Sequence, residues 1–155
     1  MPSYILLVCE RNAGRSQMCQ AFFNHIKREE FTRVNPVYEA ISAGTSPGKQ
    51  VNPLVVQVMK EVGINMSDPN VYFCKGLDSD YVVSRKDDIK RVMVVCDDIS
   101  CVFPGQLNHL SINEVWDLPD TRGQPLERVK QIRAIIRDKV FDLLRRLEME
   151  DNLYL

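Results

Sequence analysis

The chain has 155 residues, and its 45% hydrophobic and 26% charged residues are close to the average of globular domains. This composition excludes a largely disordered chain and a fibrous repeat, and we expect one domain over residues 1–155. A formal net charge of −1 argues against a general binder of nucleic acids or acidic membranes, so neither partner is expected. The first 60 residues carry seven Lys/Arg against four Asp/Glu, which favours an anion site in this part.

The cysteines indicate the compartment. The chain has five of them, and the apolar run at its start, residues 4–9, is too short for a signal peptide. No window reaches the roughly 18 apolar residues of a membrane span. An odd number of cysteines without an export signal favours the reducing cytoplasm, where cysteines serve packing, metal binding or catalysis.

Strands and helices alternate in the hydrophobic pattern. The continuous apolar run over 4–9 predicts a buried parallel strand, and Asn52-Pro53 is typical of a helix start, for which Gly63 suits the end. Amphipathic spacing predicts further helices, and short apolar runs predict further strands. In chain order, the expected elements are a strand over 4–9, a helix over 16–28, a strand over 37–41, a helix over 53–62, strands over 92–96 and 112–116, and a helix over 126–147.

This alternation predicts an α/β fold in which helices cover both faces of a parallel sheet. Such sheets bind ligands in the loops at the carboxyl ends of their strands, which here follow residues 9, 42, 96 and 116. Residues 66–89 mix an apolar patch with polar turns and give no clear element.

The first of these loops consists of Cys9, five residues and then Arg15-Ser16. A loop around a helix start points backbone N–H groups inward, and the helix dipole adds positive potential, which suits a tetrahedral oxyanion. Arg15 can fork onto two oxygens of the anion, and the same field favours the thiolate form of Cys9. Ser16 can donate a hydrogen bond to that thiolate, and Asn12 tolerates a left-handed backbone. The expected oxyanion-binding residues are Glu10, Arg11, Asn12, Ala13, Gly14, Arg15 and Ser16.

With this loop, the chain resembles the low-molecular-weight protein tyrosine phosphatase superfamily, and most closely its thioredoxin-coupled arsenate reductase branch. The resemblance lies in Val8-Cys9, Asn12 and Arg15-Ser16-Gln17-Met18, and it continues over 42–45, 51–64 and 96–105 and from Trp116 through the last helix. It covers most of the chain except residues 66–90. It implies a four-stranded parallel sheet flanked by helices in a flavodoxin-like arrangement, in agreement with the alternation of elements.

The resemblance also implies a redox function for a second cysteine pair, Cys96 and Cys101. In this branch the nucleophile, here Cys9, forms a covalent adduct with arsenate. The resolving pair then releases arsenite and passes on a disulfide, which thioredoxin reduces. The order of attack by Cys96 and Cys101 stays open, because the spacing of this pair varies among relatives. The alternative is two unconnected thiols, and Cys19 and Cys74 are expected to be packing residues.

Relatives place a general acid in the loop after the last strand, as an Asp-Pro pair. Alignment from Trp116 assigns this acid to Asp120, which is followed here by Thr121 instead of Pro. We expect the loss of Pro to make this loop less rigid, and it leaves Asp117 as the alternative acid.

No cofactor and no metal are expected. Three thiols account for arsenate reduction without a bound cofactor, and neither His25 nor His109 has metal-ligand spacing around it. Some relatives bind potassium beneath the anion loop through acidic side chains. The approximate counterparts here, Gln20 and Asn65, are uncharged, which argues against a specific monovalent cation.

Two enzyme functions share Cys9, Arg15 and Asp120. The first is arsenate reduction with thioredoxin as reductant, and the second is hydrolysis of phosphate monoesters through a cysteinyl-phosphate intermediate. The Cys96/Cys101 pair favours the reductase. A catalytically inactive oxyanion-binding module is disfavoured, because a nucleophile, an arginine and an acid occur together. A buried cysteine beside a surface arginine is disfavoured by their spacing at a strand–helix junction.

Overall fold

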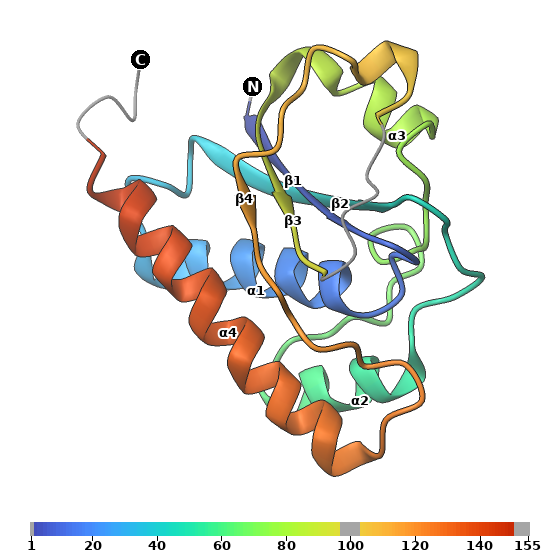
Figure 1. Ribbon diagram of the computed structural model, residues 1–155. Helices are drawn as coiled ribbons and strands as arrows, with labels where there is room; N and C mark the ends of the chain where they lie inside the picture. Colours follow the sequence, from blue (N-terminus) through green and yellow to red (C-terminus); the bar gives the residue numbers. More distant parts are fainter. Residues whose placement is uncertain (1, 97–102, 151–155) are drawn as a thin grey trace.

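The computed structural model describes residues 2–96 and 103–150 and confirms the predicted fold class. Four strands form one parallel sheet in the order β2-β1-β3-β4 (Figure 1). The strands are β1 (Ser3–Cys9), β2 (Tyr38–Gly44), β3 (Ile89–Val94) and β4 (Glu114–Val115). The helices are α1 (Arg15–Glu30), α2 (Pro53–Glu61), α3 (Asp80–Val83) and α4 (Leu126–Glu148), with short 3₁₀ helices over Lys86–Asp88 and Gly105–Leu107.

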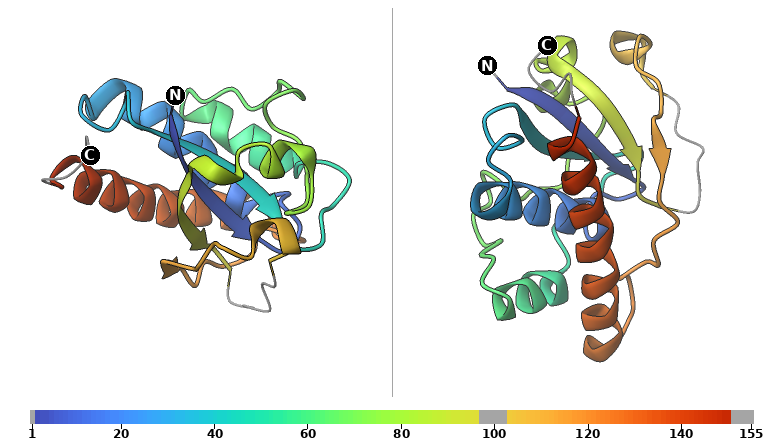
Figure 2. Two further views of the ribbon diagram at one scale, coloured as in Figure 1. Left: turned by 90° about the horizontal axis from the view of Figure 1, so that it is seen from above. Right: turned by 90° about the vertical axis from the view of Figure 1, so that its left-hand side faces the viewer.

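The sheet lies between two unequal helical layers. Helices α1, α2 and α4 lie on one side, where α1 and α4 pack together and α2 packs against α4 (Figure 2). The short α3 lies on the other side. The central strand β1 is covered from both sides, and its residues Ile5 to Val8 are at most 1% exposed. This burial explains why β1 reads as a continuous apolar run rather than an alternating one.

The helix signals predict the helix boundaries closely. Asn52 begins α2 as expected, because its Oδ1 accepts a hydrogen bond from the Leu54 N–H at 3.0 Å, and Gly63 follows the helix with a φ of +82°. Helix α1 begins at Arg15 and α4 begins at Leu126, each within one residue of the expected start. Within residues 2–96 and 103–150, no helix has the length and apolarity needed to cross a membrane.

The strand boundaries differ most from the sequence-based prediction in β2 and β3. Strand β2 continues to Gly44 instead of ending at residue 41, because Ser42–Gly44 pair with the last residues of β1. Strand β3 begins at Ile89 and ends at Val94, earlier than the predicted 92–96, although the Val95 N–H still donates to Val8 O at 2.8 Å. Hydrogen bonds between neighbouring strands set these ends, and an apolar run in the sequence gives no information about this pairing.

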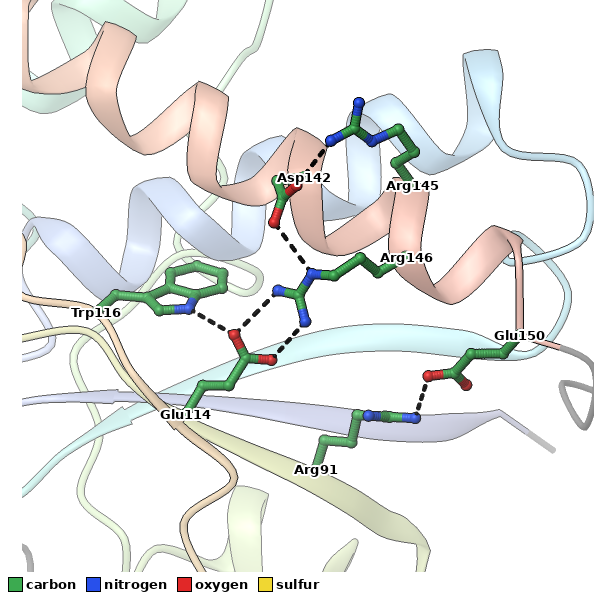
Figure 3. A network of polar contacts seen from close by, with 7 residues as sticks. All are labelled: Arg91, Glu114, Trp116, Asp142, Arg145, Arg146 and Glu150. Atoms are coloured by element: carbon green, nitrogen blue, oxygen red, sulfur yellow. Dashed lines mark hydrogen bonds and ion pairs between the residues drawn. The ribbon is translucent and has the colours of Figure 1, made fainter.

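The edge strand β4 has two residues and is held from outside the sheet. Glu114 accepts hydrogen bonds from both terminal nitrogens of Arg146 on α4, each at 3.0 Å, and from the Trp116 indole at 3.1 Å (Figure 3). The hydrogen bonds from Arg146 keep the pKa of Glu114 below its ordinary value. Asp142, one turn back along α4, holds Arg146 in turn. These contacts fix the strand that leads into the loop with Asp117 and Asp120.

Candidate active site

The loop between β1 and α1 wraps around the sulfur of Cys9. Cys9 is 3% exposed at the end of β1, and the Asn12 N–H points at its Sγ from 3.3 Å. Asn12 has a φ of +56°, the left-handed conformation that asparagine adopts more easily than most residues. Asparagine therefore allows the turn that brings the backbone N–H back to the sulfur.

A chain of hydrogen bonds reaches the same sulfur from the side chains. Asn12 Nδ2 donates to Ser16 Oγ at 2.7 Å, and Ser16 Oγ lies 2.9 Å from Cys9 Sγ. Because Ser16 Oγ already accepts from the amide, its own hydrogen is available to the sulfur. This arrangement favours the thiolate of Cys9.

Gln17 is a further residue of the site, for which the sequence pattern indicates no function. Its Nε2 donates to Asn12 O at 2.9 Å, to Asn12 Oδ1 at 3.0 Å and to Phe73 O at 2.8 Å. Gln17 is fully buried and joins the oxyanion loop to the segment around residue 73.

The segment after β2 supports the loop from outside through backbone contacts. Residues 45–52 donate N–H groups to loop carbonyls: Thr45 to Cys9, Ser46 to Glu10, Gly48 to Arg11 and Asn52 to Ala13, at 2.7–3.0 Å. These bonds hold the carbonyl groups on the outer side of the loop, so the inner side is left for N–H groups and an anion. Gly44 permits this approach, because a Cβ there would lie 2.5 Å from Glu10 O.

The loop after β4 docks onto the oxyanion loop. Arg15 is 7% exposed and donates from Nη1 to Leu118 O at 3.1 Å, and its Nη2 lies 3.6 Å from Asp120 Oδ2. Thr121 is buried, and its hydroxyl fills the place that a Cβ of Gly14 would take. The side chain of Thr121 therefore packs where the oxyanion loop has no side chain, and the expected effect of the missing Pro on the rigidity of this loop stays a prediction.

Asp120, rather than Asp117, reaches the cavity above Cys9. The cavity has a volume of about 610 Å³ and is lined by Cys9 and by Asp120, whereas Asp117 is exposed and does not line it. Four cations line it against two carboxylates: Arg11, Arg15, Lys49 and Arg122 against Glu10 and Asp120. Among the described residues no aromatic side chain lines it. The described lining of the cavity therefore carries an excess of positive charge.

The other four cysteines differ in their positions. Cys96 is 4% exposed and follows β3 by two residues; Val94 pairs with Val8, so Cys96 and Cys9 lie at the carboxyl ends of neighbouring strands. Cys101 lies outside the described residues. Cys19 is buried in the core as expected, and burial raises its pKa. Cys74, expected to pack, is only half-buried and lines a second cavity of about 460 Å³; burial raises the pKa of its thiol.

The two residues predicted as uncharged counterparts of cation ligands are not brought together. Gln20 is buried and accepts a hydrogen bond from Ser42 at 2.6 Å, whereas Asn65 is exposed and accepts from Ser67. The expectation that no monovalent cation binds here stays a prediction.

Comparison with known proteins points to one family. Residues 4–153 match the family described as low molecular weight phosphotyrosine protein phosphatase. A Halobacterium salinarum protein, whose name provisionally assigns it to the arsenate reductases, is 30% identical over 93% of this chain and 92% of its own length. The glutaredoxin arsenate reductase of Synechocystis sp. is 26% identical over 92% of this chain and 97% of its own length.

Solved structures show the same likeness. An arsenate reductase in its phosphate-binding state superposes with a TM-score of 0.72 at 25% identity and covers 93% of this chain and 98% of that chain. The thioredoxin-dependent arsenate reductase of Corynebacterium glutamicum gives a TM-score of 0.62 at 25% identity, over 94% of this chain and 61% of that longer chain.

Proposed function

The chain belongs to the low molecular weight phosphotyrosine protein phosphatase family, and on this premise we propose that it reduces arsenate to arsenite with Cys9 as nucleophile. The arsenate reductases among its relatives support this substrate. The observation that carries the proposal is the second thiol, because Cys96 lies beside the end of β1, whereas phosphate-ester hydrolysis needs only one cysteine.

In the proposed first step, arsenate binds in the loop with two oxygens on the Arg15 guanidinium. The Cys9 thiolate attacks arsenic, Asp120 protonates the departing oxygen, and water leaves. The product is a covalent Cys9–arsenate adduct. The hydrogen bond from Ser16 and the N–H of Asn12 support this step, because both favour a charged sulfur.

In the proposed second step, Cys96 attacks the Cys9 sulfur. The sulfur–arsenic bond breaks, its electron pair stays on arsenic, and arsenite leaves while a Cys9–Cys96 disulfide forms. Cys101 then attacks the Cys96 sulfur, so that a Cys96–Cys101 disulfide forms and the Cys9 thiolate is released, and the dithiol of thioredoxin reduces this disulfide. The two electrons thus come from two thiols. The relatives differ in reductant, one being named for thioredoxin and another for glutaredoxin.

The second candidate is hydrolysis of phosphate monoesters through a cysteinyl-phosphate. It is favoured by the family and requires the same Cys9, Arg15 and Asp120. The described lining of the cavity has no aromatic side chain, which disfavours phosphotyrosine among these esters, because an aromatic ring packs well against aromatic walls.

Arsenite formation over many turnovers tests the proposal, with thioredoxin, its reductase and NADPH in one series and with glutathione and glutaredoxin in another. We expect Cys96→Ser to stop reduction, to trap arsenic on Cys9 and to leave any hydrolysis of an aryl phosphate intact. Cys74→Ser is the matched control and keeps both activities, because its partly exposed thiol lies in another cavity.

Peptide mass spectrometry after one exposure to arsenate is the measurement that can contradict the reductase proposal. If the wild type forms no disulfide among residues 9, 96 and 101, the reductase proposal fails and the hydrolase takes its place. Turnover with glutaredoxin but not with thioredoxin would overturn the choice of reductant alone.

A further inference from the structure

A buried ammonium group lies next to the oxyanion loop. Lys75 is 4% exposed, and its Nζ donates to Phe73 O at 3.1 Å and contacts Asn12 Oδ1 at 3.5 Å. The Nζ lies 4.5 Å from the ring centroid of Phe73 and 4.8 Å from that of Tyr81. No carboxylate within residues 2–96 and 103–150 pairs with it.

Burial makes this position unfavourable for a charged lysine. Desolvation, opposed in part by the neighbouring thiols of Cys74 and Cys9, lowers the pKa of Lys75 to about 8. A buried cation without a counter-anion destabilises a fold, whereas an apolar side chain of similar length at the same place does not. The contacts of Lys75 therefore indicate what function a lysine serves at this position.

Lys75 contacts the one atom that sets the direction of the hydrogen bonds around Cys9. Asn12 Oδ1 faces three donors: Gln17 Nε2 at 3.0 Å, the Lys75 backbone N–H at 3.1 Å and the Lys75 ammonium at 3.5 Å. Donors on this side require the amide oxygen to face them, so the amide NH₂ must face Ser16. Ser16 then accepts from Asn12, and its hydrogen points to the Cys9 sulfur.

We propose that Lys75 is a positioning residue that, through the Asn12 amide, keeps Ser16 as a donor to Cys9 and places a positive charge behind the nucleophile. The proposal deepens the proposed function, since it concerns the thiolate that the function requires. Arg15 acts from the α1 side and can hold the oxyanion, whereas Lys75 is buried behind Asn12 and does not line the cavity.

Other titratable and charged groups also lie around Cys9 and influence its reactivity. Arg15 and Cys19 face it from α1, Cys74 lies next to Lys75 in the chain, and Cys96 lies at the end of β3. Lys75 itself also faces Arg85, whose guanidinium stacks on the Tyr81 ring at 4.0 Å. The cysteines and Arg85 are unchanged in the variants below, so a difference between variants isolates the ammonium.

The experiment follows carbamidomethylation of Cys9 by iodoacetamide from pH 5 to pH 9, with the modified peptide quantified by mass spectrometry. We expect Lys75→Met to lower the rate at pH 6 about tenfold and to move the midpoint of the pH profile upward by about one unit. The profile reports the thiolate, which a loss of packing alone does not change in this direction.

Lys27→Met is the matched control. Lys27 is also buried, at 8% exposure, donates to Asn35 O and Tyr38 O, and has a pKa lowered by burial, but makes no contact with the oxyanion loop. We expect its Cys9 profile to match the wild type. An equal shift in both variants, or no shift in Lys75→Met, would overturn the proposal.

Two further measurements keep the test decisive. If Lys75→Met does not fold, Lys75→Gln, which retains a donor near Asn12 without the charge, is expected to move the midpoint upward by a smaller amount, and an unchanged midpoint contradicts the role of the charge. Protection of wild-type Cys9 by inorganic phosphate tests the proposed function separately. Protection without a Lys75 effect refutes only the positioning role, and a Lys75 effect without protection refutes only the oxyanion site.

Discussion

The two loops that meet over Cys9 are held in different ways. The loop from Cys9 to Ser16 is fixed by β1, α1, residues 45–52 and the segment at Lys75, and Asn12 and Ser16 in it are fully buried. The loop with Asp120 touches it through Arg15 and Thr121, and Asp120 itself is 50% exposed. The proposed anion-binding part is thus preorganised before an anion arrives, whereas the proposed acid, which accepts a hydrogen bond from the Arg122 N–H at 3.0 Å, is half-exposed.

This difference suits the chemistry of the two loops. Charge stabilisation gains from donors that need no reorganisation during the reaction. A general acid must instead reach an oxygen whose position changes between substrate, transition state and product. The 3.6 Å between Arg15 and Asp120, longer than a direct hydrogen bond, leaves the carboxyl group available to that oxygen.

Among changes in the first loop, we expect replacement of the proposed nucleophile to have the largest effect on activity. We expect Cys9→Ser to abolish turnover, because a hydroxyl group is not ionised at neutral pH, while the loop still binds phosphate. Arsenite assays and calorimetric titration with phosphate measure the two effects separately. Retained arsenate reduction would show that the nucleophile lies elsewhere.

Among changes in the second loop, we expect replacement of the proposed acid to have the largest effect on activity. We expect Asp120→Asn to slow formation of the covalent adduct by about 10²–10⁴-fold while anion affinity changes little. Asp117→Asn is the control and is expected to behave as the wild type, since Asp117 is exposed away from the cavity. The reverse result would move the acid to Asp117.

Gly44→Ala tests the support of the first loop without touching its side chains. The new Cβ would lie 2.5 Å from Glu10 O and 3.0 Å from Arg11 C, both backbone atoms, so the loop must shift. We expect a loss of about 10²-fold in kcat/KM and about 1–3 kcal/mol of stability. Gly105→Ala, whose Cβ has no atom of the described residues within 4 Å, should change neither.

Lys75 makes the free energy of unfolding of the protein depend on pH. Its pKa is lowered to about 8, so between pH 8 and the ordinary value of 10.5 the unfolded chain holds a proton that the folded chain has released. The wild type therefore gains stability relative to Lys75→Met as pH rises through this window, by up to about 3 kcal/mol. Urea unfolding at pH 7 and pH 10 measures the difference, and a constant difference would contradict a buried ammonium.

The sequence predicts the first loop better than its surroundings for a physical reason. Cys9, Arg15 and Ser16 are neighbours along one strand–helix junction, so their spacing alone places them around one anion. Lys75 and Gln17 reach Asn12 through contacts between distant segments, one of them the isolated pairing of Gly44 with Gly76. Residues 66–90 carry no periodic pattern, so nothing in the sequence indicates this approach.

The loop with Asp120 also has contacts that the sequence does not predict. Alignment from Trp116 gives Asp120, and the structure brings this carboxyl group to the cavity. The contact of Thr121 with the oxyanion loop is not indicated by the sequence, because it depends on Gly14, more than 100 positions earlier. The placement of Cys101, by contrast, stays a prediction.

The ion pairs that hold β4 make the molecule unevenly sensitive to salt. Glu114, Arg146 and Asp142 lie at the surface, where dissolved ions screen charge over roughly 8 Å at physiological ionic strength. The bonds around Asn12 are buried and are screened much less. We therefore expect concentrated salt to loosen the strand that leads to the proposed acid while the shape of the oxyanion loop persists, so that ionic strength acts on the proposed proton delivery before it acts on the proposed nucleophile.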